Sequence, residues 1–164
     1  MGYKEPAKSE LLDKLLECIY ILKLRGFKLI SRIESAESRA FIDVYTGLYI
    51  EDRDFKVEVW VHAVKEKEDT YLYAVLFIAS KLKTSNELLP AVRAEIARWD
   101  ANPSEFPKVI TGIIPVIANY FSQLGKARYY RRLRELENTV EKIFGVKTKL
   151  SYMKLSDKWF EDYE

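Results

Sequence analysis

The sequence is poor in cysteine, histidine and glycine, and each shortage excludes a class of site. One cysteine and one histidine, Cys18 and His62, occur among 164 residues. An internal disulfide is therefore excluded, and a zinc site, which needs several such ligands, is not expected. The six glycines form neither phosphate-binding motif, G-x-x-x-x-G-K or G-x-G-x-x-G. No G-x-S-x-G motif accompanies His62, so we interpret it as a structural, hydrogen-bonded imidazole.

Long apolar runs are also missing. No stretch reaches the roughly 18 residues that a membrane-spanning helix needs. The longest, residues 109–124, is interrupted by polar residues, a glycine and a proline. The N-terminus, MGYKEPAKSE, lacks the apolar core of a signal peptide. We therefore expect a cytoplasmic protein with no membrane partner.

The overall composition is that of a folded domain. Hydrophobic residues make up 48% and charged residues 32%, which are globular values. The length suits one well-buried domain, 1–164, in which 156–164 is a possible docking tail. One glutamine and four asparagines accompany 27 basic and 25 acidic residues, a thermophile-like composition. The net charge of +2 does not by itself favour a polyanionic partner.

The clearest pattern is a pair of apolar runs, 55–64 and 71–79, joined by the charged segment KEKEDT. The first run alternates apolar and polar residues, and the second is apolar in both registers. This predicts a long β-hairpin whose second strand lies inside a sheet. Weaker alternation predicts strands at 27–34, 39–45 and 146–152, with SAES and Thr46-Gly47 as turns. The short links favour antiparallel pairing.

Helical spacing predicts the remaining elements. Helices are expected over 9–24, about 86–99, from 104 onward with a kink or break at Pro115, and over 126–144. Gly26 and Gly145 occupy the positions of C′ glycines. Cys18 lies near the apolar stripe of the first helix and should be buried. The predicted fold is α+β, with an N-terminal helix, a mainly antiparallel sheet of four to five strands and a C-terminal helical layer.

The beginning of helix 126–144 has the highest local positive charge. Its basic and aromatic residues are Lys126, Arg128, Tyr129, Tyr130, Arg131, Arg132 and Arg134. Arginine forks suit phosphates, and tyrosines stack on unpaired bases. This segment therefore indicates a nucleic-acid partner. The alternative is a solvated face whose arginines pair with Glu135, Glu137 and Glu141, or with the acidic tail.

A second hypothesis concerns carboxylates. The order of helix 9–24 and the strands at 27–34, 39–45 and 55–64 loosely resembles the start of PD-(D/E)XK nuclease domains. The resemblance covers about the first 65 residues. It implies Mg²⁺ as cofactor, held by Asp43 and Glu58 with Glu17 as a helical acid. Trp60 stands where that family has lysine.

The C-terminal tail provides a third hypothesis. Trp159, Phe160 and Tyr163 are large aromatic residues among acidic ones. They either complete the chain's own core or form an interface, which would make the protein a homo-oligomeric scaffold. Because no catalytic motif occurs, we expect a non-enzymatic binding or assembly protein without a cofactor, associated with nucleic acid through the basic helix.

Overall fold

The computed structural model describes residues 4–80, 88–98, 102–123 and 126–156, and the side chains of 7–80, 91–96, 102–119 and 133–153. The helices are α1 (Lys4–Leu24), α2 (Phe106–Gln123) and α3 (Lys126–Phe144). The strands are β1 (Lys28–Leu29), β2 (Glu34–Ser38), β3 (Phe41–Glu51), β4 (Phe55–Glu66), β5 (Asp69–Ser80), β6 (Leu88–Arg98) and β7 (Lys147–Ser156).

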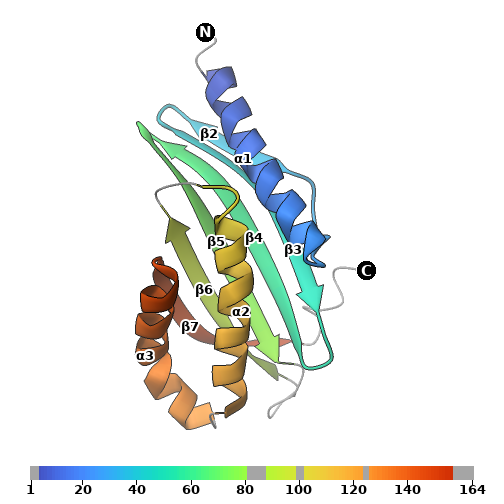
Figure 1. Cartoon of the computed structure of the whole chain (residues 1–164), viewed down its shortest axis with the longest axis vertical. Coiled ribbons are helices and arrows are strands. Elements are labelled where there is room, and N and C mark those ends of the chain that lie inside the picture. Colours follow the sequence, from blue (N-terminus) through green and yellow to red (C-terminus); the bar gives the residue numbers. More distant parts are fainter. Residues whose placement is uncertain (1–3, 81–87, 99–101, 124–125, 157–164) are drawn as a thin grey trace.

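The strands form one antiparallel sheet in the order β1-β3-β4-β5-β6-β7, with β2 also paired to β3. The described helices α1, α2 and α3 lie on the same face of this sheet (Figure 1). The α+β class, the N-terminal helix, the antiparallel sheet and the two later helices are therefore confirmed. The predicted strand number is wrong, because the described residues form a sheet of seven strands instead of four or five.

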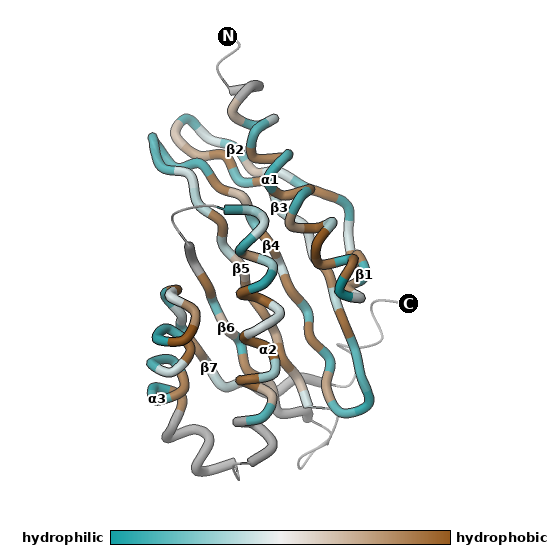
Figure 2. Tube along the Cα trace, in the orientation of Figure 1, coloured by the Kyte–Doolittle hydropathy of each residue, from teal (hydrophilic) through white to brown (hydrophobic). Residues whose placement is uncertain are grey.

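The predicted central hairpin is present, but its strands extend into the expected link KEKEDT and leave only residues 67–68 as the turn. Strands β4 and β5 pair from Phe55 opposite Ser80 to Glu66 opposite Asp69. Between them Lys67 has φ of 57°, the left-handed conformation that a two-residue hairpin turn requires. The buried residues Val57, Val59 and Val61 face the helices, whereas the turns at both ends of β4 are hydrophilic (Figure 2).

Both predicted helix-ending glycines adopt left-handed conformations. Gly26 has φ of 98° after α1, and Gly145 has φ of 64° after α3. The buried stripe of α1 includes Cys18, whose thiol lies 3.5 Å from the carbonyl oxygen of Pro103. Burial, and to a smaller extent the charge of Glu17, raises the pKa of this thiol to about 12. Cys18 is therefore a packing residue that joins α1 to the turn before α2.

The helix predicted at about 86–99 is wrong, because residues 88–98 form strand β6. The sequence LLPAVRAEIAR contains strong helix formers, yet Val92, Ala94 and Ile96 also alternate with Arg93 and Glu95. The strand pairs with β5 on one side and β7 on the other. Hydrogen bonding and burial on both sides outweigh helix propensity, which differs by less than about 1 kcal/mol per residue among these types other than proline.

The N-terminal strands also differ from prediction. The expected strand 27–34 is reduced to the two residues of β1, and the expected turn SAES belongs to β2. All five β2 residues are exposed, so no apolar alternation marks this strand in the sequence. Thr46-Gly47 is not a turn but the middle of β3. Helix α2 runs unbroken through Pro115.

Candidate nucleic-acid interface

Helix α3 and strand β7 form a basic unit at one edge of the sheet. Residues 126–156 contain nine lysines and arginines but only three glutamates, whereas the rest of the chain contains 18 basic and 22 acidic residues. The buried Leu136 and Val140 of α3 face the core, to which Leu150 of β7 also belongs. Because β7 is the last strand of the sheet, this unit, called the basic edge below, lies at the periphery.

Four described cations of the basic edge are exposed: Arg134 and Lys142 on α3, and Lys147 and Lys149 on β7. Within the described side chains, no ion pair is formed by Arg134, Lys142 or Lys147. Lys149 lowers the pKa of Glu95 on the neighbouring strand, as the weakest of several causes. Three of the four positive charges thus have no described carboxylate partner.

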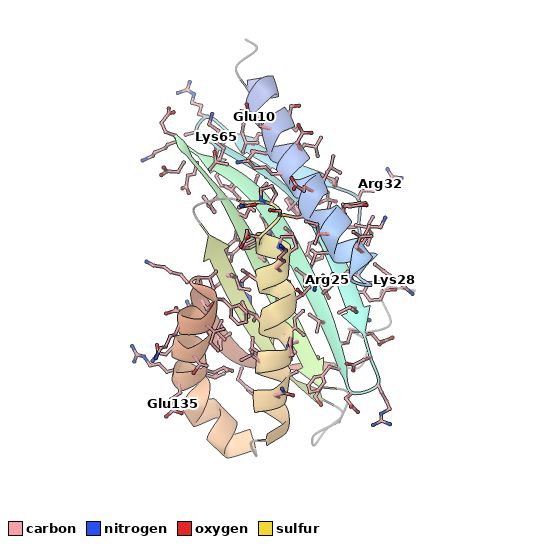
Figure 3. The ribbon with its side chains drawn as sticks, viewed as in Figure 1. Glu10, Arg25, Lys28, Arg32, Lys65 and Glu135 are labelled. Atoms are coloured by element: carbon pink, nitrogen blue, oxygen red, sulfur yellow. The ribbon has the colours of Figure 1, made fainter. Side chains whose placement is uncertain are left out.

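Two of the nearby glutamates, Glu135 and Glu141, have other contacts within the protein. Glu141 accepts the backbone N–H of Thr148 at 3.0 Å and so connects the end of α3 to β7. Glu135 lies on the outer side of α3 and has a contact of its own (Figure 3). Glu141, one of the three acids predicted to pair with the arginines, therefore forms a hydrogen bond to the backbone of β7.

Sequence reasoning placed the site only on the helix. Arg134 is the one predicted basic residue whose side chain is described; the side chains of Lys126, Arg128, Tyr129, Tyr130, Arg131 and Arg132 lie outside the described ones. Trp159, Phe160 and Tyr163 are outside the described residues altogether. Lys142, Lys147 and Lys149 were not predicted from the sequence. The contrast in charge between 126–156 and the rest of the chain would have identified them.

The sheet face away from the helices carries a band of aromatic and ionisable residues. Tyr45, His62 and Tyr73 occupy paired positions on β3, β4 and β5. The rings of Tyr45 and His62 stack with centroids 5.0 Å apart, and Tyr73 is tilted against His62 at 5.5 Å. Nδ1 of His62 lies 3.0 Å from the Asp43 carboxylate, and both side chains are largely buried. The prediction that His62 is a hydrogen-bonded imidazole is confirmed.

The same band continues to β6. The Tyr73 hydroxyl donates to Glu95 at 2.6 Å, and Arg93 donates to the same carboxylate oxygen at 3.2 Å. Burial, then the hydrogen bond and charge of Glu95, raises the pKa of Tyr73 to about 12. The Tyr73 hydrogen bond, assisted by Arg93, lowers the pKa of Glu95 despite its desolvation.

These couplings predict an alkaline dependence of stability. The pKa of Tyr73 rises on folding from 10.0 to about 12, so the fold favours the neutral phenol. The contribution of Tyr73 to the free energy of unfolding is fully present below pH 10 and is lost between pH 10 and 12. We expect Tyr73→Phe to lose less stability over that interval than the wild type, as measured by denaturant unfolding. Tyr20→Phe, at an exposed position of α1, should follow the wild type; a Tyr73→Phe profile identical to the wild type would contradict the coupling.

The carboxylates of the nuclease hypothesis are not brought together. Asp43 pairs with Val64, which is six residues from Glu58 along β4, or about 20 Å at the rise of a strand. One metal ion cannot bridge that separation. Glu17 is exposed on α1, which covers the opposite face of the sheet. Trp60, in the lysine position of that family, donates its indole N–H to Glu58.

Glu58 instead lies among buried side chains. It is 4% exposed, and its neighbour on the same face, Lys56, is 3% exposed. The Lys56 ammonium lies 5.2 Å from the ring centroid of Tyr49. Burial raises the pKa of Glu58, while the Trp60 hydrogen bond and the charge of Lys56 oppose this shift. Glu58 is thus a packed structural residue.

The described residues contain no group of three histidine, cysteine or acidic side chains that could hold a metal ion. None of the helices in the described part of the chain is both long and apolar enough to cross a membrane. No protein-family model matches the chain, and no curated protein or solved structure is significantly similar to it.

Proposed function

We propose that the protein is a non-enzymatic binding protein that engages nucleic acid through the basic edge. The observation that carries this proposal is the segregation of charge. A chain of net charge +2 concentrates an excess of six positive charges in one helix and one adjacent strand. Such a surface attracts a polyanion over long range, because each neutralised phosphate releases condensed counterions.

The exposure of the cations supports the same partner. Arg134 and Lys142 lie on α3, and Lys147 and Lys149 lie on the adjoining β7, so contacts to several phosphates are available from two elements. By sequence, α3 contributes four more cations toward its N-terminus. Lysines on an edge strand also oppose pairing with a second sheet. This favours a polyanionic partner over a scaffold that assembles through β7.

The test is binding of short single- and double-stranded DNA and RNA over a salt series. With about three to five phosphate contacts, the logarithm of the affinity should fall against the logarithm of salt concentration with a slope of about −2.7 to −4.5 for duplex DNA and about −2 to −3.5 for single strands. The triple variant Arg134→Glu, Lys147→Glu, Lys149→Glu should weaken binding at least about tenfold and reduce the slope by up to about three.

A matched control separates the basic edge from net charge. The control is a triple variant that changes the net charge by the same amount, Lys23→Glu, Lys28→Glu, Arg32→Glu. Its positions are exposed and lie near the opposite end of the sheet; Lys28 and Arg32 are labelled in Figure 3. The proposal requires this variant to retain most of the wild-type affinity. Equal losses for both triples, or no binding by the wild type at low salt, would refute it. A homo-oligomer through the aromatic tail stays a separate prediction, tested by light scattering.

A further inference from the structure

A cavity lies on the helix side of the sheet, remote from the basic edge. It occupies about 480 Å³ between the end of α1, the β3–β4 hairpin and the middle of α2. Volumes of about 300–1,000 Å³ are typical of small-molecule sites. Figure 3 shows Arg25, from the end of α1, beside this region. The cavity is therefore large enough for a ligand and open to solvent at its polar margin.

The interior of the cavity is apolar. Its apolar lining residues are Phe27, Ile50, Phe55, Val57, Ile114, Pro115 and Ala118. Phe27 and Val57 belong to the buried core, whereas Ile50, Phe55 and Ile114 are only partly buried. The partly buried side chains present hydrocarbon surface, and covering it with an apolar ligand is favourable because that surface leaves water.

The margin of the cavity is acidic. Glu51, Asp52 and Asp54 line it from the β3–β4 hairpin, and Arg25 is the one cationic residue among its described lining. The Asp52 carboxylate accepts the backbone N–H groups of Asp54 and Phe55 at 2.8 and 2.7 Å, which fixes the turn. Asp54 also contacts Arg53 at 3.6 Å, but that pair is highly exposed and contributes little. Among the described lining residues, acidic side chains thus outnumber basic ones, and Glu51 and Asp52 also have interactions within the protein.

Helix α2 adds an acceptor. Pro115 has no N–H group to donate to the carbonyl of Thr111, one turn earlier in the helix. Thr111 and Pro115 both line the cavity. A carbonyl without its usual helical donor and a group of carboxylates both suit a ligand that donates hydrogen bonds and carries positive charge.

We propose that this cavity binds a small amphipathic amine, in which an apolar alkyl or aryl-alkyl body carries a primary ammonium group. The body lies against the Ile50, Phe55 and Ile114 surface, and the ammonium group faces the hairpin carboxylates. This inference is independent of nucleic-acid binding, because none of the described side chains of the basic edge lines the cavity.

Three probes of equal length test the charge requirement. Heptylamine, heptanol and heptanoate are titrated at pH 7 against the full-length protein by calorimetry and by amide chemical shifts. We expect saturable one-to-one binding of heptylamine, at least fivefold weaker binding of heptanol and no binding of heptanoate. Binding of heptanoate as tight as that of heptylamine, or no saturable binding of heptylamine, would overturn the proposal.

Two variants locate the site. Ala118→Trp fills the cavity and should abolish heptylamine binding, while Ala36→Trp, at an exposed β2 position, should not. Because the tryptophan at 118 also risks disturbing the fold, Asp54→Lys provides a second test at an exposed turn. Asp54→Lys should weaken heptylamine binding about tenfold. Asp13→Lys, at an exposed position of α1, should leave heptylamine binding unchanged. Equal effects of the two lysine variants would show that the hairpin does not bind the ammonium group.

Discussion

Replacing Phe106 by alanine is expected to lower the free energy of unfolding by about 3–5 kcal/mol. Phe106 is the first residue of α2 and is fully buried. Its N–H group bonds to the carbonyl of Asn102 at 3.1 Å, and the Asn102 side chain accepts the N–H of Ser104 at 3.0 Å. The backbone on the N-terminal side of the ring is therefore held in place, and it cannot easily move into the space that alanine leaves.

The surroundings of Phe106 limit relaxation further. The preceding residues contact α1 through Pro103 and Cys18, and the ring belongs to the same core cluster as Leu15 and Leu76. A void where two helices meet the sheet loses both the transfer free energy of the ring and its dispersion contacts.

The measurement is denaturant unfolding followed by circular dichroism. Phe106→Leu, which keeps most of the volume, should cost no more than about 1.5 kcal/mol. Ile143→Ala, at a side chain that is 59% exposed, should change stability by less than about 0.5 kcal/mol. The m-value, which is the slope of the free energy of unfolding against denaturant concentration, should stay constant across the series. A loss below about 1 kcal/mol for Phe106→Ala would show that α2 docks without this anchor.

Elements whose burial matches their sequence period were predictable. The 55–80 hairpin, α1 and α3 have apolar residues at the spacing of the face they bury, and glycines end both helices. Strand β6 was not predictable in this way, because Val92 and Ile96 fit both helical and strand spacing. Only its pairing with β5 and β7, whose partner residues lie 12 to 68 positions away in the sequence, decides between them.

The candidate sites depend even more on the tertiary structure. The positive charge at the start of α3 is visible in the sequence, but Lys147 and Lys149 join it only because β7 returns to the sheet beside α3. The cavity combines Arg25, Asp54 and Thr111, which are separated by tens of residues and belong to different elements. No local pattern in the sequence predicts that these residues lie together in the fold.

Gly47→Ala is expected to cost about 2 kcal/mol, although alanine ordinarily suits a strand better than glycine. A Cβ atom at residue 47 would lie 2.8 Å from Cη2 of Trp60 and 2.9 Å from two further ring atoms. The indole therefore lies directly over the β3 backbone, at a position where β4 pairs with it. To admit the methyl group the ring must move, which also disturbs its hydrogen bond to Glu58.

A double-mutant cycle with Trp60→Ala isolates this cause. Once the indole is absent, Gly47→Ala has nothing to displace and should be neutral or stabilising by a few tenths of a kcal/mol. The coupling free energy between residues 47 and 60 should then be about 2 kcal/mol. Additive losses in unfolding free energy would mean that residue 47 is constrained by its own backbone and not by the ring. The sign of Gly47→Ala thus depends on the Trp60 ring, which leaves no room for a Cβ atom at residue 47. The glycine that makes Thr46-Gly47 resemble a turn in the sequence is therefore accounted for by side-chain packing in the middle of a strand.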